Sequence, residues 1–112
     1  MCKGLYPYLL VLMPFMVGCK DKKLTPSCNG DTPTYDNGIS AIINAECNTS
    51  TCHGTGSSQA EFTSYAGMAL AISNGNFEKK VLVDQTMPRN DFLTQDQIDL
   101  IQCWVDNGYP EN

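Results

Sequence analysis

The sequence predicts a small all-α domain, and three observations lead to this prediction. Apolar residues recur at helical spacing in three segments, near residues 39–47, 64–73 and 94–105. No Asn-Gly turn lies between alternating apolar and polar runs, so nothing indicates a β-hairpin. The chain has 112 residues, which allows one small domain and excludes a multidomain enzyme.

Residues 1–18 have the layout of a secretory signal peptide. Lys3 is their only charged residue, an apolar run extends from Leu5 to Val17, and the small residue Gly18 precedes Cys19. The run is shorter than the roughly 20 residues of a spanning helix, and an uncleaved membrane anchor is the alternative. Export would place the rest of the chain where disulfides and covalent cofactor attachment are possible.

Residues 16–19, Met-Val-Gly-Cys, resemble the processing box of bacterial lipoproteins. In that family the cysteine becomes the first mature residue and carries lipid, so the resemblance implies lipidation of Cys19. Secretion with Cys19 free or in a disulfide is the alternative. Residues 19–34 are polar and contain proline and glycine, which predicts a tether and an entry loop.

A first helix is expected after this loop. Asp36 or Asn37 would cap it, and isoleucines at 39, 42 and 43 form its apolar stripe. It would end at about Cys47, because residues 48–59 are rich in Asn, Thr, Ser and Gly and predict a loop.

A second helix is expected to start near Thr63 or Ser64 and to end at Asn74-Gly75. Its apolar face would contain Tyr65, Met68, Ala69 and Ile72. The apolar residues Phe77, Val81 and Leu82 indicate a short helical turn, and residues 84–93 a loop that holds Met87-Pro88.

The last helix has the clearest boundaries. Thr94 with Gln97 forms a capping box at its start. Apolar residues keep helical spacing from Ile98 to Val105, and Gly108 would form the C-terminal cap.

Cys47, Cys52 and His53 are the residues with the most specific chemistry. Two cysteines separated by two residues and followed by histidine are the attachment motif of c-type haem. Here the spacer has four residues, Asn-Thr-Ser-Thr, which are small and polar and could bulge outward. The two thiols must reach two vinyl groups of one haem, and the residue after the second thiol lies under the iron. His53 is the only histidine in the chain.

From residue 35 to residue 112 the chain resembles a monohaem class I cytochrome c domain of an exported bacterial lipoprotein, with a variant haem-attachment motif. The resemblance rests on Cys52-His53-Gly54, Met87-Pro88, the start of the last helix at residues 93–98, and residues 104–110 at its end. It implies three to four helices wrapped around one covalently bound haem c, with the first and last helices crossing.

The resemblance also implies roles for individual residues. Cys47 and Cys52 would form the thioether bonds, His53 would be the proximal iron ligand, and Met87 the distal one. The alternative for Met87 is a surface or gap-filling side chain, and Met68 is expected in the core.

The same resemblance implies a disulfide between Cys28 and Cys103. In the cytochrome c fold the first and last helices cross, and here Cys28 precedes the first helix while Cys103 lies within the last.

The expected function is electron transfer to redox partner proteins in the cell envelope, in the periplasmic space or at the outer membrane surface, without enzymatic activity. The net charge of −5 argues against a nucleic-acid partner and against docking on anionic lipid through a basic face. The alternative is a haem-free lipoprotein binding module stapled by disulfides, in which Cys47 and Cys52 pair with each other or bind a metal with His53.

Overall fold

A computed structural model describes residues 23–89 and 91–112. The predicted signal peptide and the candidate lipidation site Cys19 lie outside the described residues. The described residues form four helices and no strand, with one isolated β-bridge between Thr34 and Gly38. The prediction of an all-α domain is therefore confirmed. No helix in this part of the chain is long and apolar enough to cross a bilayer.

Helix α1 spans Ile39–Glu46 and starts later than predicted. Its N-cap is Gly38, with φ 113°, and neither Asp36 nor Asn37 caps it. The reason is a turn in which the Thr34 hydroxyl accepts a hydrogen bond from the Asn37 amide at 3.0 Å. Only a residue without a side chain adopts this φ readily, so Gly38 lets the chain leave the turn and enter the helix.

Helix α2 spans Tyr65–Ser73 and begins and ends as predicted. The Ser64 side chain accepts a hydrogen bond from the Gly67 amide and caps it, and Asn74 is the C-cap. The short turn expected near Phe77 is a π-helix, η1, over Glu78–Val83. Val81 and Leu82 of η1 are buried, so the apolar pattern located the helical segment but not its π geometry.

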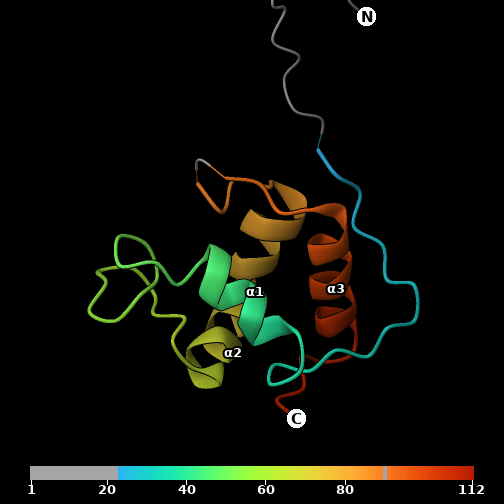
Figure 1. The fold of residues 1–112 in the computed structure, drawn as a ribbon, viewed down its shortest axis with the longest axis horizontal. Coiled ribbons are helices and arrows are strands. Elements are labelled where there is room, and N and C mark those ends of the chain that lie inside the picture. Colours follow the sequence, from blue (N-terminus) through green and yellow to red (C-terminus); the bar gives the residue numbers. More distant parts are fainter. Residues whose placement is uncertain (1–22, 90) are drawn as a thin grey trace, which may run out of the picture.

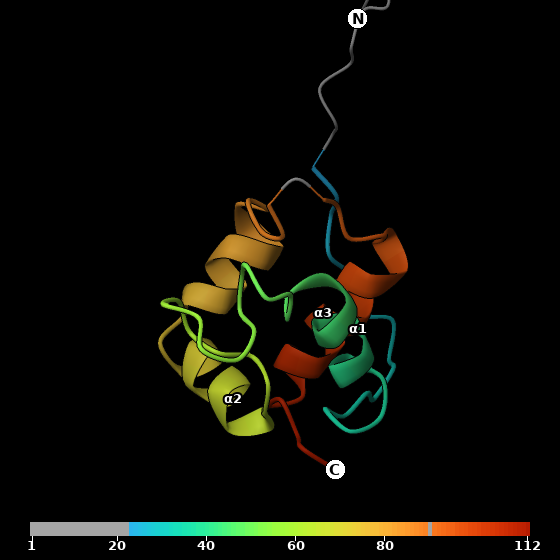
Figure 2. The same cartoon turned by 60° about the vertical axis from the view of Figure 1, so that its left-hand side comes forward.

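Helix α3 spans Gln95–Asp106, and the predicted capping box between Thr94 and Gln97 is present. Gly108 follows the helix with a φ of 82°, in the left-handed region that glycine favours at helix ends. Helix α3 packs against α1 (Figure 1). The first and last helices are thus in contact, and the chain enters and leaves the molecule at opposite ends (Figures 1 and 2).

The core draws buried side chains from all four helices of the described chain. The largest of the fully buried side chains are Trp104, Ile39, Ile43, Met68 and Ile101. The complete burial of Met68 confirms its expected place in the core. Cys47 belongs to this cluster, and the partly buried Met87 packs against it, so the core borders the residues that the sequence singled out.

Candidate cofactor site

A cavity of about 380 Å³ lies beside the core, and the four predicted haem-binding residues all line it. Cys47 ends α1, Cys52 and His53 follow in the next loop, and Met87 comes from the loop before α3. The fold therefore brings two distant segments of the chain to one cavity.

Backbone hydrogen bonds shape the loop between the two cysteines. The His53 amide donates to the Cys47 carbonyl at 3.1 Å, and the amides of Cys52 and Gly54 both donate to the Thr49 carbonyl at 3.0 Å. The side chains of residues 49–51 are exposed. The spacer thus loops outward, as the sequence suggested, while its ends stay joined.

Gly54 is required by this loop. A Cβ atom at Gly54 would lie 2.8 Å from the backbone oxygen of Thr49. Real Cβ atoms do not approach a backbone oxygen so closely, so any side chain here would push the loop apart. This explains why glycine follows His53.

The His53 ring is held from two sides. Its Nδ1 lies 2.5 Å from the Ala60 carbonyl oxygen, and its plane stacks on Phe62 at 4.0 Å with an interplanar angle of 9°. Because a carbonyl can only accept, we assign the proton of the neutral ring to Nδ1. The lone pair on Nε2 is then available to a metal, as in most histidine ligands with an outer-shell partner.

Cys47 and Cys52 are free thiols in different environments. Cys47 is only 9% exposed, and burial, with smaller effects of Glu46 and Cys52, raises the pKa of its thiol to about 11. Hydrogen bonds from Thr49 and Thr51, helped by the charge of Arg89, lower the pKa of the half-buried Cys52. Cys52 is therefore the more readily ionised thiol.

The rest of the cavity combines an apolar wall with a polar edge. Phe62 and Phe77 line the cavity. Tyr65 is not among its lining residues, and its hydroxyl donates to the Tyr109 carbonyl at 3.0 Å. Lys80 and Arg89 supply two cations to the lining. The acidic residues Glu46 and Asp91 also belong to the lining, and its other members include Ala71, Asn74, Asn76, Val81 and Pro88.

Sequence reasoning missed Ala60 and Lys80. Ala60 acts through its carbonyl group, which every residue has, so no sequence pattern identifies it. Lys80 lines the cavity because it belongs to the π-helix η1. Since a π-helix has no distinctive apolar period, the sequence did not indicate which of its side chains would face the cavity.

The predicted disulfide between Cys28 and Cys103 is present, with a Cα–Cα distance of 4.6 Å. The alternative pairing of Cys47 with Cys52 is not formed. Within residues 23–89 and 91–112, no group of three or more His, Cys, Asp or Glu side chains is arranged to hold a metal ion. This gives no support to a metal site made of Cys47, Cys52 and His53.

Comparison of the chain with protein-family models, with curated proteins and with solved structures gave no match.

Proposed function

We propose that this protein is an electron carrier of the cell envelope that holds one covalently bound haem c. The observation that carries the proposal is the convergence of Cys47, Cys52, His53 and Met87 on one cavity. Cys47, Cys52 and His53 are close together in the sequence, so their proximity is expected. Met87 belongs to a distant loop, and its place on the same cavity depends on the fold. We also propose that lipid on Cys19 tethers the protein to a membrane.

The cavity has the chemical character that a haem requires. Its volume of about 380 Å³ lies in the range of cofactor pockets, roughly 300–1,000 Å³. Two thiols, an imidazole and a thioether line it, and Phe62, Phe77 and Val81 add apolar surface. Lys80 and Arg89 offer positive charge to the carboxylates of a haem.

Each residue has a distinct role in this proposal. The thiols of Cys47 and Cys52 would each add across one vinyl group, with a new carbon–sulfur bond and the proton on the other vinyl carbon. His53 would bind iron through Nε2, and Met87 would be the second axial ligand. Bound haem supplies reversible one-electron chemistry at its iron, and thioether ligation raises its reduction potential.

The protein's own contribution is to hold this arrangement fixed. The Ala60 carbonyl and the Phe62 ring orient the His53 imidazole. The apolar wall would limit the access of water, which reduces reorganisation on electron transfer. The packing of α1 against α3 and the order of the motifs favour a cytochrome c-like fold. His53 is the only histidine, so no second imidazole could serve as a catalytic acid or base, and we propose a carrier that passes electrons between redox proteins.

The direct test is a pyridine haemochrome spectrum of full-length protein expressed with a cytochrome c maturation system. We expect the spectrum of one covalently bound haem c. A protein that is exported and folded but gives no such spectrum would contradict the proposal and favour a haem-free binding module.

A matched pair of variants sharpens this test. His53→Ala should give no stable haem-containing protein, because no other imidazole can replace the proximal ligand. Ser50→Ala changes an exposed residue of the same loop and should retain haem. Equal haem contents in the two variants would exclude His53 as the iron ligand.

A further inference from the structure

We propose that the end of the molecule where the chain leaves toward Cys19 docks on an anionic bilayer surface. The surface consists of Lys23, Val83 at the end of η1, and loop residues 84–89, 91 and 92; we call it the tether face. This inference rests on the lipid anchor of the proposed function. It adds an orientation that the anchor alone does not specify.

The first argument is the short covalent link between Cys19 and the folded domain. Gln85 binds both backbone groups of Leu24, accepting from its amide at 2.9 Å and donating to its carbonyl at 2.6 Å. The Ser27 amide donates to Asp99 at 2.9 Å, and Cys28 is joined to Cys103. The chain is thus fixed to the domain from Leu24 onward. From Cys19 to Leu24 it can reach at most about 18 Å, even when fully extended.

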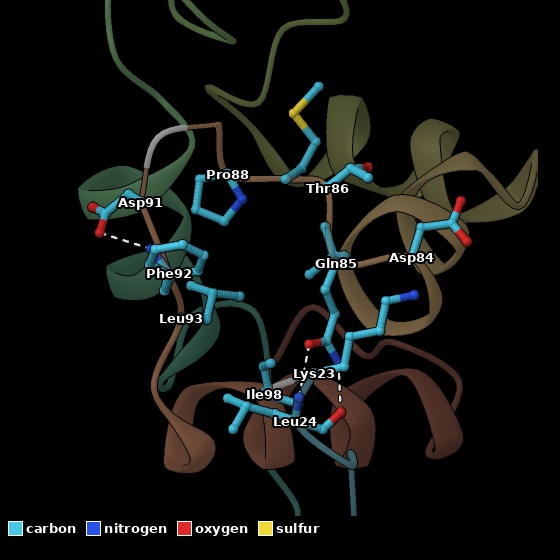
Figure 3. A pocket seen from close by; sticks show the side chains of 12 residues that line it. Lys23, Leu24, Asp84, Gln85, Thr86, Pro88, Asp91, Phe92, Leu93 and Ile98 are labelled. Atoms are coloured by element: carbon cyan, nitrogen blue, oxygen red, sulfur yellow. Dashed lines mark hydrogen bonds between the residues drawn. The ribbon is translucent and has the colours of Figure 1, made fainter. Parts of the chain in front are cut away.

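The second argument is exposed apolar surface at this end. Val83 is 65% exposed and Phe92 is 69% exposed. Lys23 lies beside Val83, since its Nζ donates to the Val83 carbonyl at 3.4 Å. It also shares the lining of a cavity of about 730 Å³ with Phe92 (Figure 3). The third exposed large apolar side chain of the described residues is Leu70. It belongs to α2, which lies toward the opposite end of the molecule (Figures 1 and 2).

The third argument is the distribution of positive charge. Apart from Lys3, the basic residues of the chain are Lys20, Lys22, Lys23, Lys79, Lys80 and Arg89. They therefore belong to the tether, to η1 or to the loop that follows it. No Lys or Arg occurs in residues 24–78 or 90–112, which contain ten acidic residues. Lys79 is paired with Asp84, and Lys80 and Arg89 line the cofactor cavity. Lys20, Lys22 and Lys23 of the tether are therefore the charges that an anionic surface would attract to this end, while it would repel the acidic remainder of the domain.

Two acidic residues, Asp84 and Asp91, also lie at this end, and each already has a partner within the domain. Asp84 is paired with Lys79 at 2.8 Å, and Asp91 accepts a hydrogen bond from the Phe92 amide at 2.8 Å. The net charge of the whole chain predicts no basic face, because it averages the basic tether with an acidic domain. We infer that local charge, not net charge, decides how the protein meets a membrane.

Docking would also cover one side of the loop that holds the predicted second iron ligand. Met87 and Pro88 line both the cofactor cavity and the cavity of the tether face. The two cavities therefore share part of this loop as a wall. A redox partner would have to approach the cofactor from a side that the bilayer leaves open.

Hydrogen exchange of the full-length, lipid-bearing protein tests the orientation. The protein is reconstituted in vesicles of phosphatidylcholine with phosphatidylglycerol, and separately in neutral detergent micelles. We expect amides of residues 83–93 to exchange severalfold more slowly in the vesicles, and those of α2 to be unchanged. High salt should reduce the slowing, because it screens the charges.

Paired variants show whether the tether face itself makes the contact. Val83→Ser with Phe92→Ser should lose most of the slowing, whereas Leu70→Ser, an exposed apolar residue on α2, should keep it. Equal exchange in vesicles and micelles would overturn the proposal, as would slowing at α2 or failure of the protein to sediment with vesicles. Slowing in micelles that grows with protein concentration would indicate contact between copies of the chain and would also overturn it.

Haem content measured on the same samples separates this inference from the proposed function. Haem without slowing at residues 83–93 would exclude only the docking. Slowing without haem would exclude only the electron carrier.

Discussion

The two cysteine pairs in the described chain differ in bonding and in access to the cavity. Cys28 and Cys103 are bonded to each other, and Cys103 is completely buried in α3. Cys47 and Cys52 are free, line a cavity and lie next to the only histidine. The first pair joins the entry segment to the last helix, and the second pair remains available for chemistry. We propose that bonding and access to the cavity distinguish a structural from a functional cysteine pair in this protein.

The largest expected effect comes from removing the cavity pair. Cys47→Ala with Cys52→Ala should abolish covalent haem attachment, because no other free thiol lines the cavity among the described residues. The Cys28–Cys103 disulfide should still form. Denaturing electrophoresis with haem staining measures the loss, and non-reducing peptide mapping detects the disulfide. Haem that stays covalently bound to this variant would exclude these thiols as its attachment points.

Removing the disulfide pair should instead lower the stability of the fold and leave haem attachment unchanged. The bond links residues 75 apart in sequence, so Cys28→Ala with Cys103→Ala should lower the free energy of unfolding by roughly 4 kcal/mol in the chain-entropy model. Denaturant titration of the haem-containing protein measures this loss. The haem content of the folded fraction should stay the same, and a fall in it would mean that the two pairs are not independent.

The two methionines of the described chain extend the comparison. Met87→Ala should leave haem attached but lower its reduction potential and remove the thioether-to-iron charge-transfer band. Met68→Ala should instead cost about 2–5 kcal/mol of stability, because Met68 is fully buried, and should leave the band intact. Redox titration and visible spectra measure these effects. A band that survives Met87→Ala would show that another residue is the sixth ligand.

The smallest effect is a difference between the two free thiols in haem-free protein. The thiolate is the reactive form, and the pKa of Cys52 is lowered while that of Cys47 is raised to about 11. Near neutral pH, Cys52 should therefore react faster with iodoacetamide, and Cys47 should gain reactivity as the pH rises toward 11. Peptide mass spectrometry after timed alkylation measures both rates. Equal rates near neutral pH would contradict the asymmetry described for the cavity.

The sequence predicted the helices best where side chains alone determine their ends. The start of α2 near Ser64 and the capping box of α3 are confirmed, because hydroxyl and amide side chains cap both helices locally. The start of α1 was predicted too early, because the Thr34 turn competes for the same residues.

The sequence predicted the chemical groups of the candidate site but not the residues that surround and orient them. The motif identified two thiols, an imidazole and a thioether, and the fold places all of them on one cavity. The contact of the Ala60 carbonyl with His53 and the approach of Lys80 to the cavity depend on three-dimensional arrangement. Sequence spacing carries no information on these contacts.

The most direct test of the central claim is the intact mass of the exported full-length protein. The account predicts a polypeptide, with its lipid, heavier by one haem after denaturation and removal of all noncovalent material. A mass that corresponds to the lipid-bearing polypeptide alone would contradict it.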